Sequence, residues 1–189
     1  MPEKPLTLTD PEKLILIMLS EIQEHLKIKG EVDPAFIKEA IFSGNLWALG
    51  WELPGIFQNR VISEKVVSEV VNFLSMWQRI EESYEALSAQ DKAWLEKEAD
   101  PFGKPRFTGF DGNNEGEYIS AAQFLTQKMD RFDRFHKRDL NSHSPSIAVH
   151  RRMYEVFDPL LHGEILHHDM TAQQLALVLK ARTHPDHRQ

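Results

Sequence analysis

The segment from Phe107 to Tyr118 is where the residue types of this chain are best suited to chemistry. It reads FTGFDGNNEGEY and places two phenylalanines, glycines and acidic side chains directly before a helical pattern. Aromatic rings can line a ligand pocket between helices, and a carboxylate inside such a pocket can transfer a proton. The structural alternative is that Phe107 and Phe110 anchor the loop to the core while Asp111 or Asn113 caps the next helix.

A calcium loop is a more specific interpretation of the same segment. Oxygen ligands at Asp111, Asn113 and Glu115, with Gly116 in the sixth position, match the beginning of an EF-hand loop. An EF-hand closes its cage with a bidentate Glu at the twelfth position, where this chain has Ala122. The sequence therefore does not predict an EF-hand.

Nine histidines raise the question of a transition-metal site. A helical metal pair needs two histidines four residues apart, and the histidines of this chain do not provide that pattern in a recognised form. We predict no metal and no cofactor, and for His150, on an apolar stripe, a hydrogen-bonded core or interface imidazole. The sequence leaves open whether the segment 162–169 binds a metal through its candidate ligands His162, Glu164, His167, His168 and Asp169.

Nucleophilic catalysis and nucleic-acid binding have little support. The chain has no cysteine, no Gly-x-Ser-x-Gly elbow and no phosphate-binding Gly-x-x-x-x-Gly-Lys loop. Residues 130–138 interleave aromatics with cations, which suits a single-stranded nucleic acid, but Asp130, Asp133 and Asp139 largely cancel that charge. The net charge of −7 also repels phosphate polymers and anionic membranes. We expect neither nucleic acid nor a membrane as a partner.

The elements that must position these residues are helices, because apolar residues recur every three or four positions along most of the chain. The sequence predicts an all-α fold: a single-domain bundle of about seven or eight helices around one long central helix. That central helix runs from Ser63 to about Leu87 and has a broad apolar face, which favours a buried core helix over a coiled-coil dimer. Its stripe comprises Val66, Val70, Phe73, Trp77, Ile80, Tyr84 and Leu87.

Capping residues and breakers mark the other helices and the domain limits. We expect a flexible N-terminal extension over 1–8, a helical domain over 9–183 and a frayed tail over 184–189. Residues 45–59 should form a short turn of helix followed by an apolar loop. The remaining helices are expected from Thr9 to about 27–30, from Asp33 to Gly44, after Ser88, from Tyr118 to about His136, from about Ser146 to near Gly163, and after Thr171.

The residues from Phe107 onward resemble the YfbU family of bacterial proteins, with departures at Gly112, Asn113 and Asn114. The resemblance implies a bacterial, cytosolic, all-helical protein without an assigned activity. It suggests that one group of residues forms a binding neighbourhood, and we predict no catalytic residue in that group. Any residue of the group that contacts Arg131 must lie on another element or another subunit. The predicted binding neighbourhood consists of Phe107, Gly109, Phe110, Asp111, Glu115, Tyr118 and Arg131. These residues also carry the resemblance, together with Phe124, Phe132 and Phe135.

Two functions from different classes are compatible with these features. We predict a non-enzymatic cytoplasmic protein that acts through self-association, as a homo-oligomer, or through a protein partner, because Trp47, Trp51 and Phe57 lie in a loop-like stretch. The alternative is a small-ligand-binding protein or enzyme with a pocket around the Gly-Phe-Asp segment. A helix-turn-helix regulator over residues 33–53 is a weaker idea, since the acidic balance opposes DNA binding.

Overall fold

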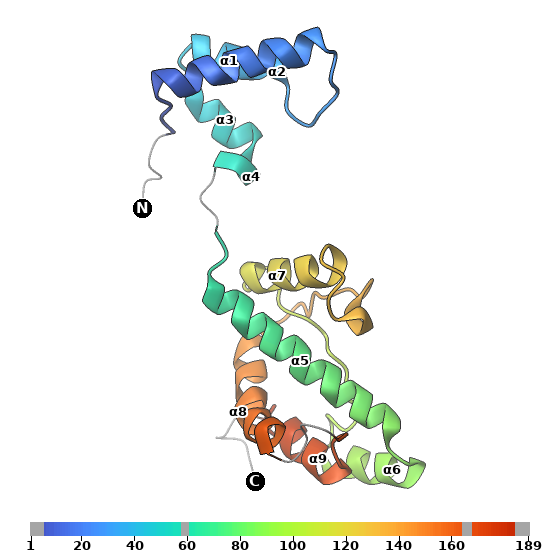
Figure 1. Ribbon diagram of the computed structural model, residues 1–189. Coiled ribbons are helices and arrows are strands. Elements are labelled where there is room, and N and C mark those ends of the chain that lie inside the picture. Colours follow the sequence, from blue (N-terminus) through green and yellow to red (C-terminus); the bar gives the residue numbers. More distant parts are fainter. Residues whose placement is uncertain (1–5, 58–60, 164–167, 184–189) are drawn as a thin grey trace. The chain divides into compact units, whose positions relative to one another are not determined.

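A computed structural model describes residues 6–57, 61–163 and 168–183 of the chain. Within these ranges it contains nine α-helices, one short 3-10 helix and no β-strand, so the all-α prediction is confirmed. None of the helices in these ranges has both the length and the apolar character of a membrane span. The residues gather into two compact units, Met1–Val61 (unit 1) and Ile62–Gln189 (unit 2) (Figure 1). The predicted tail 184–189 and most of the predicted extension 1–8 lie outside the described residues, and the domain limits stay a prediction.

Unit 1 consists of α1 (Asp10–His25), α2 (Pro34–Phe42), α3 (Leu46–Glu52) and α4 (Pro54–Phe57). Both predicted helix starts are confirmed: Thr9 and Glu12 form a capping box, and the Asp33 carboxylate accepts a hydrogen bond from the Ala35 amide. The expectation of an apolar loop after α3 was wrong in part, because Pro54 begins a further helical turn. The Leu53 carbonyl accepts hydrogen bonds from the Ile56 and Phe57 amides at 3.0 and 3.1 Å and closes that turn.

The core of unit 1 is small. Its fully buried apolar residues, among those described, are Ile37, Ala40 and Leu49, with α1 packed on α2 and α2 on α3. Helix α1 contributes a single buried residue, Ser20. Most of the apolar surface of the longest helix in this unit is therefore not used in the unit's own core.

Unit 2 is built around α5 (Glu64–Ala86), which packs against α7 (Gly116–Gln127), α8 (Ile147–Gly163) and α9 (Ala172–Lys180). Helix α6 (Ala89–Glu98) packs on α9, and the 3-10 helix η1 (Asp133–Phe135) precedes α8. The predicted central helix is confirmed and runs the length of the unit in Figure 1. Its stripe is buried at Val66, Val70, Phe73, Trp77 and Ile80, and partly buried at Tyr84 and Leu87.

Three helix starts in unit 2 agree with their capping signals, whereas one helix end does not agree with the prediction. Ser63, Ser88 and Thr171 each accept a hydrogen bond from an amide in the first turn of the helix that follows. Helix α7 ends at Gln127, well before the predicted end at His136. Asp130 and Phe132 adopt positive φ angles of 49° and 58°, so the chain turns although its apolar spacing continues.

The centre of unit 2 is a cluster of aromatic rings around the buried side chain of His150 on α8. The ring centroids of Phe73, Phe107 and Phe110 lie 5.4, 5.5 and 5.4 Å from that of the imidazole. Trp77 donates its indole N–H to His150 Nδ1 at 3.1 Å, and His150 Nε2 lies 3.2 Å from the Gly109 carbonyl oxygen. Because the indole can only donate, Nδ1 must accept and Nε2 must carry the proton. The predicted core imidazole is therefore neutral and fully hydrogen-bonded.

Burial of His150 should make the stability of unit 2 depend on pH. Desolvation, with a smaller contribution from the positive charge of Arg182, lowers the pKa of His150 to about 4, although the Gly109 hydrogen bond opposes the shift. The neutral form is preferred in the folded state, so this stability is complete above the unfolded pKa of about 6.5 and is lost as pH falls toward 4. We expect a loss of about 3 kcal/mol in unfolding free energy over that interval.

The measurement is urea unfolding between pH 4 and 7.5 for the native chain and for His150→Gln, which does not titrate. The native chain should show the steeper pH dependence, and parallel curves would contradict the assignment. Nitrogen-15 NMR of the native chain is an independent check, since it should show the Nε2–H tautomer down to about pH 5.

Candidate functional site

The predicted site lies on an extended segment that enters the core of unit 2. Phe107 and Phe110 are buried, and Phe110 forms an isolated parallel bridge with Asn141. The Phe110 amide donates to the Leu140 carbonyl at 2.9 Å, and the Ser142 amide donates to the Phe110 carbonyl at 3.0 Å. These bonds matter because a buried backbone outside regular helix or sheet must find a partner for each N–H and C=O group.

Glu81 of α5 holds the beginning of the segment. Its buried carboxylate accepts a hydrogen bond from the Phe107 amide at 2.8 Å and two from the Arg138 guanidinium at 2.8 and 2.7 Å. Arg134 approaches the same carboxylate at 3.5 Å and makes a two-point bond to Glu85. One buried acid thus joins three parts of the chain: α5, the extended segment and the residues after η1.

Gly109 lies where no other residue fits. Its φ angle is +92°, and a Cβ atom there would be 1.8 Å from the Leu140 carbonyl oxygen. The close approach lets the Gly109 carbonyl accept a hydrogen bond from His150 Nε2 and brings its oxygen to 3.0 Å from Ser146 Oγ. The glycine of the Gly-Phe-Asp segment is therefore required by backbone geometry and packing.

Asp111 does not cap the next helix, and that expectation was wrong. Its carboxylate accepts hydrogen bonds from the Asn113 amide at 3.0 Å and from the Asn114 side chain. These bonds from Asn114 and Asn113 lower the pKa of Asp111. The residue at the N-cap position of α7 is Glu115, which makes no capping bond to that helix. Asp111 instead closes the loop between the extended segment and α7.

Glu115 caps a different helix, α8. Its Oε1 accepts hydrogen bonds from the Ser146 and Ile147 amides at 2.7 and 2.8 Å, and its Oε2 accepts from Ser146 Oγ at 2.8 Å and from the Asp111 amide at 2.9 Å. Burial alone would raise the pKa of Glu115, but the hydrogen bonds from Ile147, Asp111 and Ser146 outweigh it and lower the pKa. The carboxylate also stands at the positive end of the α8 dipole.

Tyr118 joins α7 to α5 and α8 at the edge of the core. Its hydroxyl donates to the Glu69 carboxylate, and Arg151 donates to Glu69 Oε2 at 2.8 Å and to the Tyr118 oxygen at 3.0 Å. Burial and the neighbouring Glu69 raise the pKa of Tyr118. A raised pKa keeps the phenol protonated, so these contacts stabilise its donor role and do not produce a phenolate base.

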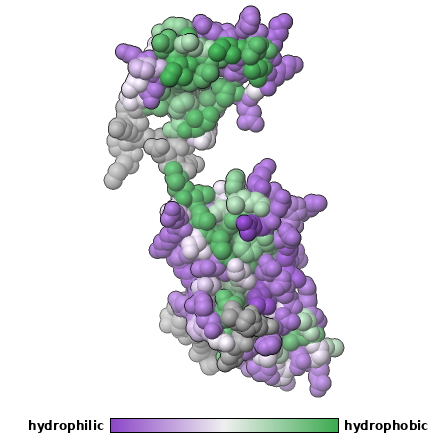
Figure 2. All heavy atoms as spheres, viewed as in Figure 1, coloured by the Kyte–Doolittle hydropathy of each residue, from purple (hydrophilic) through white to green (hydrophobic). Residues whose placement is uncertain are grey.

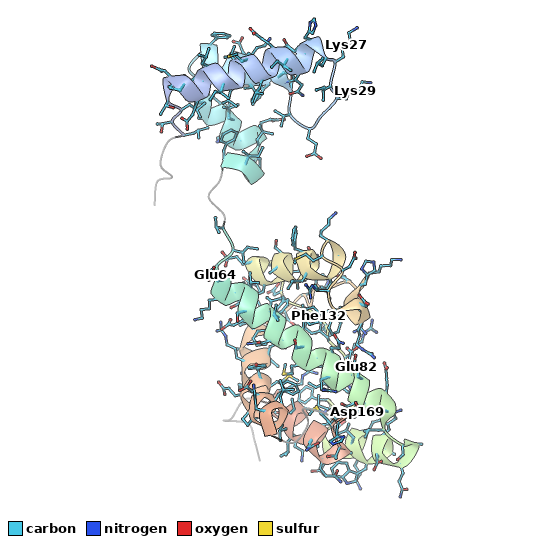
Figure 3. The ribbon with its side chains drawn as sticks, viewed as in Figure 1. Lys27, Lys29, Glu64, Glu82, Phe132 and Asp169 are labelled. Atoms are coloured by element: carbon cyan, nitrogen blue, oxygen red, sulfur yellow. The ribbon has the colours of Figure 1, made fainter. Side chains whose placement is uncertain are left out.

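Arg131 does not lie among the other predicted residues. It is exposed in the turn after α7 and lines a shallow pocket of about 630 Å³. Two other lining residues, Glu82 and Phe132, are labelled in Figure 3. The further lining residues are Gln78, Asp130, Asp133, Arg134 and Arg138. The structure thus brings six of the seven predicted residues together and leaves Arg131 apart. Their role in binding stays a prediction.

No metal site can be built from the described part of the histidine-rich segment. His162 lies 3.0 Å from the Asp158 carbonyl oxygen through Nδ1, whereas Glu164 and His167 lie outside the described residues. Among the residues that the structure describes, no three His, Asp or Glu side chains are placed to hold a metal ion.

Sequence reasoning missed Glu81, Glu69 and Ser146, which hold the segment in place. A signal existed for Glu81, because it follows Trp77 by four positions and Leu74 by seven and so lies on the buried face of α5. A charge on such a face needs a partner, and two arginines supply it. The partners themselves are too distant in sequence to be read from a local pattern.

Replacement of Gly109 by Ala should severely destabilise unit 2. The positive φ and the contact with Leu140 together should cost at least about 3 kcal/mol. Gly116→Ala is the matched control, because a Cβ atom there meets nothing within 4 Å. Thermal unfolding of both variants provides the measurement, and equal melting temperatures would show that the close approach is not a constraint.

Replacement of Glu115 by Gln should uncouple the loop from α8. The NH₂ group of the Gln side chain would face backbone N–H groups that now donate to the Glu115 carboxylate. The expected loss in unfolding free energy is about 3 kcal/mol. Because the folded pKa is lowered, the native chain has this stability above pH 4.5 and loses it as pH falls through the folded pKa. Glu117→Gln, at an exposed position of α7, should change little. Urea unfolding at pH 7 compares the two, and a similar effect of both would contradict the capping role.

The family comparison agrees with the resemblance drawn from the Gly-Phe-Asp segment. The YfbU domain matches residues 6–181, which include nearly all the described residues of both units. YfbU is a family of unknown function, so the match assigns no activity to the segment. Since the match covers well over half of the 189 residues, the chain belongs to the YfbU family.

Proposed function

We propose that this YfbU-family protein acts without catalysis, as a bacterial cytoplasmic protein that associates with itself or with a protein partner. The observation that carries the proposal is an apolar face on α1 that unit 1 leaves exposed. Each of its six side chains is at least 50% exposed, and green hydrophobic residues spread over the visible surface of unit 1 in Figure 2. This surface, called the α1 face below, consists of Leu14, Ile15, Met18, Leu19, Ile22 and Leu26.

The orientation of α1 is the opposite of what its amphipathic pattern favours. A surface helix normally turns its apolar stripe toward the core and its polar side toward water. Here the inward side holds Leu16, Ile17 and the buried Ser20, whereas the larger stripe faces outward. Its six side chains present roughly 500 Å² of apolar surface, at the upper end of what a monomeric protein exposes. Such a surface supports an interface.

Aromatic residues of the same unit add to this argument. Trp47 and Trp51 on α3 are 57% and 81% exposed and meet edge to face, with ring centroids 5.3 Å apart. Phe42, at the end of α2, is 75% exposed. Tryptophan and phenylalanine are enriched in protein–protein interfaces, where their large rings contribute much of the binding free energy.

The Gly-Phe-Asp segment gives less support to the alternative of an enzyme or small-ligand-binding protein. The Asp111 and Glu115 carboxylates are occupied by hydrogen bonds from the loop and from the start of α8. Phe107 and Phe110 lie in the aromatic cluster around His150. These side chains therefore serve the fold of unit 2, and association through unit 1 is the function that we favour.

Association should depend on the α1 face. We expect the native chain at about 100 µM to have a mass above the 21.9 kDa of one chain, or to retain a protein partner through purification. Leu19→Glu, which places a charge in the apolar interface, should weaken association at least about 100-fold. Sedimentation and light scattering measure both, with circular dichroism to confirm folding.

The matched control is Leu177→Glu on α9. Leu19 and Leu177 are 56% and 58% exposed, so the two replaced side chains have similar exposed fractions but lie on different helices. The control should associate like the native chain. A native chain that is strictly monomeric and retains no partner would overturn the proposed function.

A further inference from the structure

We propose that the partner of the α1 face is a second copy of this chain, and that the two α1 helices pair in antiparallel orientation. The inference rests on the proposed function, association through unit 1, and goes further by naming the occupant and its geometry. Three properties support it: the symmetry of the face, its size and the direction of the α1 helix dipole.

The α1 face can complement itself. At about 100° per residue its six side chains span an arc of about 140° on the helix, with Leu14 and Leu19 at the edges and Ile22 near the middle. A twofold axis through the midpoint of the stripe, between residues 20 and 21, would place Ile15 of one copy beside Leu26 of the other. The same axis would place Leu19 beside Ile22. The apolar stripe therefore meets an apolar stripe along its whole length.

The size of the face fits a helix pair formed by two copies. Its roughly 500 Å² per copy is most of the about 800 Å² that each partner contributes to a standard interface. Unit 1 needs such cover, because its own buried apolar core is limited to Ile37, Ala40 and Leu49 among the described residues. A small unit with so few buried side chains gains much of its stability from an oligomeric contact.

The dipole of α1 favours the antiparallel orientation. Antiparallel pairing brings the positive amino end of each α1 helix beside the negative carboxyl end of the other, whereas parallel pairing would place like ends side by side. Side chains of both signs lie near each end, with Asp10 paired to Lys13 at the amino end and Glu24 before Lys27 and Lys29 at the carboxyl end. The helix dipoles, and not the side-chain charges, therefore set the expected orientation.

Single cysteines can test this geometry cleanly, because the native chain has none. We would prepare Ile15→Cys and Leu26→Cys separately and oxidise each variant alone and as a mixture. In the antiparallel pair two copies of residue 15 are about 16 Å apart, too far for a disulfide, whereas residues 15 and 26 of different copies are neighbours. Each variant alone should stay uncrosslinked, and the mixture should form a covalent heterodimer.

A mixture of Ile15→Cys with Leu177→Cys measures collisional crosslinking. Leu177 is 58% exposed on α9 and lies outside the α1 face. The Ile15→Cys and Leu26→Cys mixture should exceed this control by roughly tenfold or more, because association raises the effective concentration of the two thiols. Adding Leu19→Glu to both members of the mixture should remove the excess.

The remaining outcomes separate this inference from the proposed function. Crosslinking of each variant with itself would mean parallel pairing and would overturn the antiparallel geometry. A native chain that associates without the heterodisulfide uses another surface, which overturns the inference and leaves association standing. A native chain that is monomeric alone but binds a different protein through the α1 face also overturns this inference and leaves the proposed function standing. A monomer that binds no protein overturns both.

Discussion

Unit 2 depends on one constraint: a stretch of backbone without regular structure is buried in its core, and each polar group of that stretch needs a partner. Glu81 accepts from the Phe107 amide, His150 donates to the Gly109 carbonyl, and Glu115 accepts from the amides at the start of α8. Since an unpaired buried polar group costs about 1–3 kcal/mol, these bonds determine how α5, α7 and α8 can pack around the segment.

The same side chains explain why this segment resembles a functional site without forming an evident one. Catalytic and ligand-binding sites combine glycine, aromatics and buried acids because they need close backbone approach and desolvated charge. A buried structural joint needs the same residue types for a different reason. In this chain Gly109 admits the Leu140 backbone, and the acid at position 115 caps a helix from a distant part of the sequence.

The sequence was sufficient to predict most of the helices, the capped starts of α1, α2, α5, α6 and α9, and the buried stripe of α5, because these depend on residues a few positions apart. It was insufficient for Glu115, whose partner Ile147 is 32 residues away, and for Glu81, 57 residues from Arg138. The early end of α7 was missed because Phe132 keeps the helical spacing while the chain turns. Periodicity identified the apolar residues of α1, but it does not say whether the same chain or another one covers them.

Unit 1 and unit 2 thus carry different kinds of apolar surface: the α1 face is exposed, whereas the apolar core of unit 2 is closed around a buried segment. Amide hydrogen exchange of the full chain, measured at about 1 and 100 µM, tests this contrast most directly. The account predicts that exchange over residues 14–26 slows at the higher concentration, whereas residues 107–115 are equally protected at both. Concentration-independent exchange in α1, or rapid exchange over 107–115, would contradict it.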